Sequence, residues 1–125
     1  MNHTQALKTY LDALGKADYQ KLMALFSEDA LVLSPLYGER PAAAFYKDLF
    51  QDTRASELTF LDVFTNPHGD KACINFLYRW TMADGSVTVF DCVDVVEFDP
   101  NGKIKQLKII YDTAQTREKF DSLKN

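Results

Sequence analysis

The apolar residues near the start of the chain recur every three or four positions, which is the spacing of one helix face. This pattern predicts a first helix over residues 4–14, which Gly15 would end. Asp18 is a suitable N-cap for a second helix, which would bury Leu22, Leu25 and Phe26 and end near Ser27. A short strand is predicted over residues 30–34, and Pro41 suits the first turn of a third helix.

Beyond residue 56 the pattern changes to long stretches rich in β-branched and aromatic residues. They predict strands over residues 57–65, 71–82, 86–98 and 103–112, followed by a short terminal helix over residues 113–123. Helices followed by an antiparallel meander are typical of an α+β fold. We therefore expect a single domain over residues 1–125, with its N-terminal helices packed on a curved antiparallel sheet.

Two aspartates, Asp91 and Asp94, lie in the strand predicted over residues 86–98. Aspartate is depleted in strands, and an odd separation places these two side chains on opposite faces. Asp94 shares its face with the more apolar residues, among them Phe90, Cys92 and Val96. Asp94 is therefore predicted to be the buried carboxyl.

The turns on either side of this strand predict which residues surround Asp94. A two-residue turn at Asp84 and Gly85 would pair Ala83 with Ser86. This register would place Asn75 opposite Asp94, with Leu77 and Arg79 on the same face. A turn at Asn101 and Gly102 would bring Ile109 opposite Asp94 and Tyr111 opposite Cys92. The predicted pocket floor therefore comprises Asn75, Leu77, Cys92, Asp94, Ile109 and Tyr111.

The other face of the strand over residues 71–82 is strongly apolar in this register, since it carries Ile74, Phe76, Tyr78, Trp80 and Met82. Such a face is too apolar to face solvent. We expect a homodimer that buries this outer sheet face, and the alternative is that the terminal helix covers it.

Composition narrows the function classes. The chain has 125 residues, 46% hydrophobic and 26% charged, with a net charge of −4, which gives no electrostatic reason to bind nucleic acid. It has no apolar run long enough to span a membrane, and its N-terminus lacks the pattern of a signal peptide, so we expect a cytoplasmic protein. Cys73, Cys92, His3 and His68 lack the spacing of a metal site, so neither a metal nor a cofactor is predicted.

Four segments, in their order and spacing, carry a family resemblance over nearly the whole length: LKTYLDALGKAD, YQKLMALFSEDALVLSP, G-x-RPAAAFY and DVVEFDPNGKIKQLKIIYD. The chain resembles the NTF2-like (nuclear-transport-factor-2-like) superfamily, in its SnoaL-like and ketosteroid isomerase-like branch. The resemblance implies a cone-shaped, cystatin-like fold around an internal pocket. It also implies an oxyanion pair, with Tyr10 as the tyrosine and Asp94 as the protonated aspartate, and Tyr46 supporting Tyr10.

The chain departs from the family at the general base, where Ser34 occupies the position of the usual aspartate. A serine hydroxyl cannot remove a proton from carbon at neutral pH without a neighbouring base. Asp112 or Glu39 could supply a carboxylate from another direction. The resemblance to limonene-epoxide-hydrolase-like members, which place an arginine between two aspartates, would use Arg79 but lacks a second inward aspartate.

Three functions remain open: an isomerase- or cyclase-type enzyme acting on a small carbonyl compound, a non-catalytic module that binds an apolar carbonyl or phenol-like ligand, and a protein-interaction domain. The structural alternative is that Tyr10 is a packing aromatic and Asp94 a buried polar residue bonded to Asn75. The expected pocket comprises Tyr10, Phe26, Ser34, Tyr46, Asn75, Leu77, Arg79, Asp94, Ile109 and Tyr111.

Overall fold

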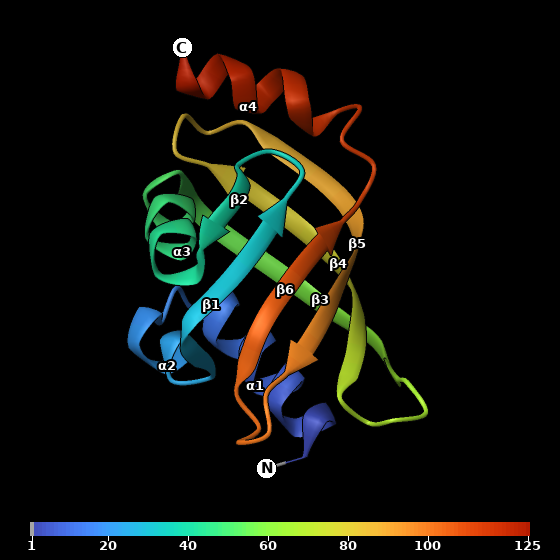
Figure 1. The fold of residues 1–125 in the computed structure, drawn as a ribbon. Coiled ribbons are helices and arrows are strands. Elements are labelled where there is room, and N and C mark those ends of the chain that lie inside the picture. The colour runs from blue at the N-terminus through green and yellow to red at the C-terminus, as the bar shows by residue number, and fades with distance from the viewer. Residues whose placement is uncertain (1) are drawn as a thin grey trace.

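The computed structural model describes residues 2–125, which form a curved six-stranded sheet with helices packed against its concave face (Figure 1). The helices are α1 (His3–Gly15), α2 (Tyr19–Met23), α3 (Ala42–Gln51) and α4 (Thr116–Lys124). The strands are β1 (Phe26–Ser34), β2 (Gly38–Pro41), β3 (Thr53–Thr65), β4 (Lys71–Met82), β5 (Val87–Phe98) and β6 (Ile104–Ile110). The predicted α+β class is confirmed.

The strands follow the order β2-β1-β6-β5-β4-β3, and all neighbouring pairs are antiparallel except β1 and β6, which run parallel. The meander from β3 to β6 was predicted, whereas the short strand β2 and the parallel pairing of β1 were not. Figure 1 shows α4 lying across one end of the sheet, beside the loop that joins β4 and β5.

The helix starts follow from local capping. Asp18 accepts a hydrogen bond from the Lys21 backbone at the start of α2, as predicted. At the start of α1, the Asn2 side chain accepts one from the Gln5 backbone, a cap that was not predicted. The second helix is shorter than predicted, however. It ends at Met23, and Phe26 already belongs to β1, where it pairs with Ile104 of β6.

The turn between β4 and β5 differs from the predicted two-residue turn and changes the register of β4. Met82 donates its backbone N–H to Ser86, so the loop has three residues, and Gly85 closes it with φ of +89°. This is the conformation expected of a three-residue hairpin loop that ends in a left-handed glycine. The register consequently places Ile74, rather than Asn75, opposite Asp94.

A shift of one residue exchanges the two faces of β4. Ile74, Phe76, Tyr78, Trp80 and Met82 are therefore buried in the interior, and this set cannot form the dimer surface that the sequence predicted. Asn75, Leu77 and Arg79 lie on the opposite, outer face. The alternative prediction, that the terminal helix covers these apolar residues, is partly right, because Phe120 of α4 packs against Trp80.

Ile109 lies opposite Asp94, as predicted, although the turn between β5 and β6 was not predicted correctly. Asp99, rather than Pro100, pairs with Lys103, and a bulge between Glu97 and Phe98 restores the predicted register. The ladder ends at the pair of Val93 and Ile110, before the predicted pair of Cys92 and Tyr111.

Asp94 is only 1% exposed, whereas Asp91 is exposed on the outer face. The inference from strand parity about these two aspartates is thus confirmed. No helix within residues 2–125 has the length and apolar character needed to cross a membrane.

Candidate functional site

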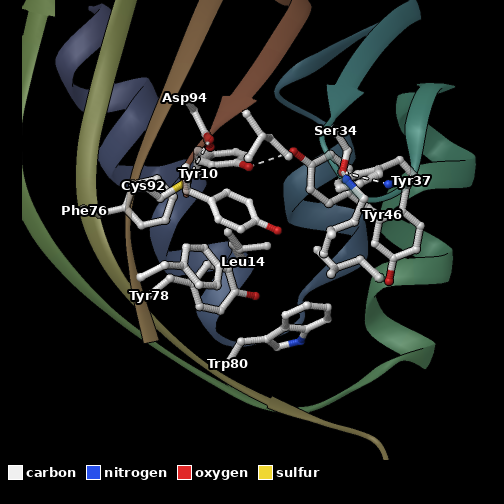
Figure 2. A pocket seen from close by; sticks show the side chains of 16 residues that line it. Tyr10, Leu14, Ser34, Tyr37, Tyr46, Phe76, Tyr78, Trp80, Cys92 and Asp94 are labelled. Atoms are coloured by element: carbon white, nitrogen blue, oxygen red, sulfur yellow. Dashed lines mark hydrogen bonds between the residues drawn. The ribbon is translucent and has the colours of Figure 1, made fainter. Parts of the chain in front are cut away.

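A cavity lies between the concave face of the sheet and the helices (Figure 2). Most of its lining is aromatic, and Asp94 is the single carboxyl among the described residues that line it. Its volume is about 40 Å³, which is room for about three water molecules. The lining residues are Tyr10, Leu14, Ser34, Leu36, Tyr37, Phe45, Tyr46, Leu49, Phe76, Tyr78, Trp80, Phe90, Cys92, Asp94, Ile109 and Tyr111.

Tyr10 of α1 and Tyr46 of α3 share a hydrogen bond of 2.7 Å between their hydroxyl oxygens. Both side chains are buried, and burial raises the pKa of each phenol well above its ordinary value. Both phenols are therefore protonated. Because the pair has two protons and shares one hydrogen bond, the second hydroxyl proton can be donated to a third group, which is Asp94 in the ligand-free protein. Phe26 packs against both rings but, contrary to the expectation, does not line the cavity.

Asp94 enters the cavity from β5 on the same side as Tyr10 (Figure 2). Its carboxylate accepts a hydrogen bond from the Cys92 thiol at 3.4 Å. Within residues 2–125 it forms no ion pair with Lys, Arg or His. Burial raises its pKa to about 7, although hydrogen bonding by Cys92 and Tyr10 acts in the opposite direction. Asp94 can therefore be either a hydrogen-bond donor or an acceptor near neutral pH.

Ser34 lies at the end of β1, where its hydroxyl oxygen accepts backbone hydrogen bonds from Leu36 at 3.2 Å and Tyr37 at 3.1 Å. These bonds hold the turn into β2 and place Tyr37 at the cavity. A hydroxyl group has two acceptor lone pairs and one proton. With both lone pairs engaged, Ser34 can offer the cavity only a donor.

The lining residue Tyr37 is held in place by Asp52, at the end of α3, and by α4. The Tyr37 hydroxyl donates to Asp52 at 2.6 Å, and Lys124 of α4 forms an ion pair with the same carboxylate at 2.9 Å. Phe120, also of α4, packs edge-on against the Tyr37 ring. The terminal helix therefore supports the lining residue Tyr37 from outside the cavity, through an apolar contact with its ring and an ion pair with its hydrogen-bond partner Asp52.

The structure places six of the expected pocket residues in the cavity: Tyr10, Ser34, Tyr46, Asp94, Ile109 and Tyr111. The expected positions of Asn75, Leu77 and Arg79 are wrong, because the three-residue loop turns them outward. Asn75 donates to Asp91 and to the backbone of Cys92, Leu77 is 39% exposed, and Arg79 pairs with Glu57. The alternative bond between Asn75 and Asp94 is excluded by the same register.

Sequence reasoning missed the aromatic wall formed by Phe76, Tyr78 and Trp80 on β4. The alternation of aromatic residues along β4 is visible in the sequence. The prediction assigned these residues to the outer face only because it assumed a two-residue loop. The two proposed substitutes for the general base lie outside the cavity: Glu39 is exposed on β2, and Asp112 lies in a groove on the outer face. Within residues 2–125, no cluster of His, Cys, Asp or Glu is arranged to hold a metal ion.

Solved structures with the same architecture share little sequence with this chain. An NTF2-like protein of unknown function from Burkholderia pseudomallei K96243 has a TM-score of 0.81 and 19% identity, over 94% of this chain and 96% of that one. A candidate polyketide cyclase from Pseudomonas putida KT2440 has a TM-score of 0.76 and 21% identity, over 94% and 97%. These likenesses establish the NTF2-like fold.

A third structure of this fold contains a bound small molecule. It is a hypothetical protein with a ketosteroid isomerase-like fold from Catenulispora acidiphila DSM 44928, in complex with trimethylamine. Its TM-score is 0.75 at 11% identity, over 90% of this chain and 88% of that one. No curated protein shows significant sequence similarity to the chain. The model of the SnoaL-like domain matches residues 7–107, and the chain therefore belongs to the SnoaL-like domain family.

Proposed function

We propose that this protein binds a small, mainly apolar carbonyl or phenol-like molecule in the cavity. The observation that carries the proposal is the Tyr10–Tyr46 hydroxyl pair next to a buried carboxyl that forms no ion pair with any described residue. One tyrosine proton and the proton of a neutral Asp94 can both be donated to a single ligand oxygen. Such donors in a cavity that excludes water stabilise a developing negative charge on oxygen.

The size of the cavity limits the ligand. Pockets for drug-sized molecules have volumes of about 300–1,000 Å³, whereas this cavity has about 40 Å³. A single small ring already requires side chains of the wall to move. The lining includes half-buried side chains: the stacked rings of Phe90 and Tyr111, whose centroids are 4.0 Å apart, and Leu36 and Tyr37 in the turn after β1. We therefore expect a compact ligand rather than a steroid.

Catalysis of the isomerase or cyclase type is the finer form of this proposal. Membership in the SnoaL-like family and the fold shared with a candidate polyketide cyclase support it. The alternative is binding without turnover. Ser34, at the position of the usual base, favours this alternative, because both lone pairs of its hydroxyl oxygen accept backbone hydrogen bonds.

A small organic cation is the second candidate ligand. Aromatic rings bind ammonium groups through their faces, and an ionised Asp94 would add an unpaired buried charge to the ring-lined cavity. The complex of a protein of the same fold with trimethylamine supports this candidate. The two candidates differ in the protonation state that they require of Asp94, which makes them separable by pH.

The test is a binding titration with substituted phenols of graded acidity and with trimethylamine, at about one pH unit on each side of the Asp94 pKa of about 7. Trp80 is the only tryptophan of the chain and lines the cavity, so its fluorescence reports binding. Tyr10→Phe and Asp94→Asn are the test variants. Asp91→Asn is the matched control, because Asp91 lies on the same strand but on the outer face.

The proposal predicts that more acidic phenols bind more tightly, that binding weakens at the higher pH, and that both test variants weaken it about ten-fold or more. The control variant should bind as the native protein does. If trimethylamine binds more tightly than the phenols, and its binding strengthens as pH rises, the proposed carbonyl or phenol-like ligand is wrong and a small cation is the ligand. Phenol binding that is indifferent to both test variants would refute the proposed site.

We also propose that the protein forms a homodimer through the outer sheet face. The residues first assigned to this interface lie in the interior, but the true outer face is also partly apolar, with Phe64, Leu77, Val89 and Ile110 all exposed. These residues belong to four adjacent strands, and Asp91 lies among them. A second copy of the same face would remove this apolar area from water.

A further inference from the structure

Several polar groups of the cavity wall are already satisfied by partners that do not line the cavity. The Tyr37 hydroxyl donates to Asp52 at 2.6 Å, and the indole N–H of Trp80 donates to Thr53 at 2.8 Å. The hydroxyl of Tyr78 is bonded in the same way to a serine of β3, at 2.9 Å. These three lining residues therefore offer a ligand mainly the faces and edges of their rings.

The polar groups that a ligand inside the cavity can use lie at two separate places. The first is the Tyr10–Tyr46 hydroxyl pair with Asp94, and the second is the hydroxyl of Ser34. In Figure 2, Asp94 and Ser34 lie on opposite sides of the dashed line that joins the two tyrosine hydroxyls. Tyr111 also lines the cavity, but it borders a groove on the outer face as well. A ligand that fills the cavity therefore meets hydrogen-bonding groups on two sides.

The turn after β1 fixes the direction of the Ser34 hydroxyl proton. The hydroxyl oxygen is attached to Cβ and accepts the backbone N–H groups of Leu36 at 3.2 Å and Tyr37 at 3.1 Å. A hydroxyl oxygen has two lone pairs and one proton, so only one direction remains for the proton. Among residues 2–125, no acceptor for this proton is present. Ser34 is thus a half-buried donor at the cavity whose acceptor must be water or a ligand.

We infer that Ser34 determines specificity by donating its hydroxyl proton to a second oxygen of the ligand. The inference rests on the proposed function and narrows the class of ligand to a small ring that has two oxygen atoms, such as a dihydroxybenzene or a cyclic diketone. One oxygen binds to the Tyr10–Tyr46 pair and Asp94. The other oxygen, on the far side of the ring, accepts the proton of Ser34.

Ser34 discriminates between ligands by the direction of the hydrogen bond. It donates but does not accept, because backbone N–H groups occupy both of its lone pairs. An apolar ligand group at this point would displace the water that accepts the proton and leave the donor unpaired. A site built to bond an oxygen rejects an analogue that lacks it. An ionised aspartate at position 34 would repel the same oxygen, so the serine changes which ligands the cavity accepts.

The test compares ligands of matched size by isothermal titration calorimetry. Resorcinol and hydroquinone carry a second hydroxyl group, and meta-cresol and para-cresol carry a methyl group in its place. Each compound is titrated into the native protein, Ser34→Ala and Ser34→Thr, which keeps a hydroxyl group, at about one pH unit below the Asp94 pKa of about 7. Ser27→Ala is the matched control, because Ser27 also lies on β1 but does not line the cavity, and its hydroxyl donates to Asp29 and Ile104.

The quantity that decides is the ratio of the Kd of a cresol to the Kd of the matching dihydroxybenzene. A looser turn affects both members of a pair, so the ratio isolates the hydrogen bond of Ser34. For at least one pair the ratio should fall about three- to ten-fold in Ser34→Ala and keep its native value in Ser34→Thr and Ser27→Ala.

Ratios that are unchanged in Ser34→Ala for both pairs would overturn the inference. If the cresols then still bind, and bind more weakly to Tyr10→Phe, the proposed function stands without the second oxygen. If none of the four compounds binds to the native protein, both the inference and the proposed function are refuted.

Discussion

At the scale of single residues, the burial of Asp94 links its protonation to the stability of the fold. Its pKa is about 7 in the folded protein and about 3.9 for an exposed aspartate. Between these two values the folded state binds more protons than the unfolded state, so the contribution of Asp94 to stability falls as pH rises. The contribution is greatest below about pH 4 and is lost above about pH 7.

Asp94→Asn should remove this dependence. The difference in unfolding free energy between variant and native protein should therefore move in favour of the variant as pH rises from about 4 to about 8, by an amount on the order of 4 kcal/mol. Urea unfolding at several pH values measures it. Taking the difference cancels the contributions of other carboxylates, such as Asp12 and Asp70. Their pKa values are lowered, so their contributions to stability rise with pH. A free-energy difference that does not change with pH would show that the pKa of Asp94 is not raised in the folded protein.

Ser34 is expected to be a structural residue at the position of a catalytic one. Ser34→Ala would leave the backbone N–H groups of Leu36 and Tyr37 without their acceptor, and should cost about 1–3 kcal/mol of unfolding free energy. Denaturant unfolding measures this cost. A variant as stable as the native protein would mean that the serine does not hold the turn.

Several of these residue-scale features could be predicted from the sequence. Asp94 was placed inward by strand parity alone, because a period of two requires no tertiary information. The roles of Tyr10 and Tyr46 came only from the family resemblance, since a tyrosine on an amphipathic helix is also an ordinary core residue. The engagement of Ser34 with the backbone could not be foreseen, because it depends on the exact course of a turn after Pro35.

At the scale of elements, the loop between β4 and β5 decides which residues line the cavity. The sequence Ala83-Asp84-Gly85 fits a two-residue or a three-residue hairpin loop, and the two differ by one residue of register. The choice cannot be made from the local sequence when both faces of the strand contain apolar residues. On β4 the aromatic alternation of Phe76, Tyr78 and Trp80 was therefore read as an outer face, although it is the cavity wall.

The terminal helix α4 should contribute to stability mainly through one aromatic side chain. Phe120 is 7% exposed and packs against Tyr37 and Trp80, so Phe120→Ala should cost about 3–5 kcal/mol. Lys124→Ala removes an ion pair whose lysine is 46% exposed and should cost less than about 1 kcal/mol. Thermal or urea unfolding of both variants checks the ranking. Equal effects would show that packing of α4 is not dominated by Phe120.

At the scale of the whole molecule, the fold class was predictable because helices precede a long antiparallel meander, and this order leaves few architectures. The surface now proposed for a dimer was not predictable. The interface predicted from the sequence depended on the face of β4, and the register error moved it to the interior. The surface now proposed rests on the exposed side chains of Phe64, Leu77, Val89 and Ile110.

A charge in this surface should disrupt the proposed dimer without harming the cavity. Leu77→Lys places an ammonium group in the apolar part of the outer face, where a second copy would have to bury it. Sedimentation velocity should show a dimer for the native protein and a monomer for the variant at equal concentration. Gln20→Lys adds the same charge at an exposed position of α2, away from the outer face, and serves as the control. A native protein that sediments as a monomer would contradict the proposed interface.

The central claim is that a titratable, cation-free Asp94 lies in the cavity beside the tyrosine pair. The most direct measurement is a carbon NMR titration of the aspartate carboxyl groups in isotope-labelled protein, with the Asp94 signal assigned by its absence in Asp94→Asn. We predict a midpoint near 7 in the free protein, and a higher one when a phenolate is bound, because a nearby negative charge favours the neutral acid. A midpoint near the ordinary value of about 3.9, unchanged by phenols, would contradict the claim.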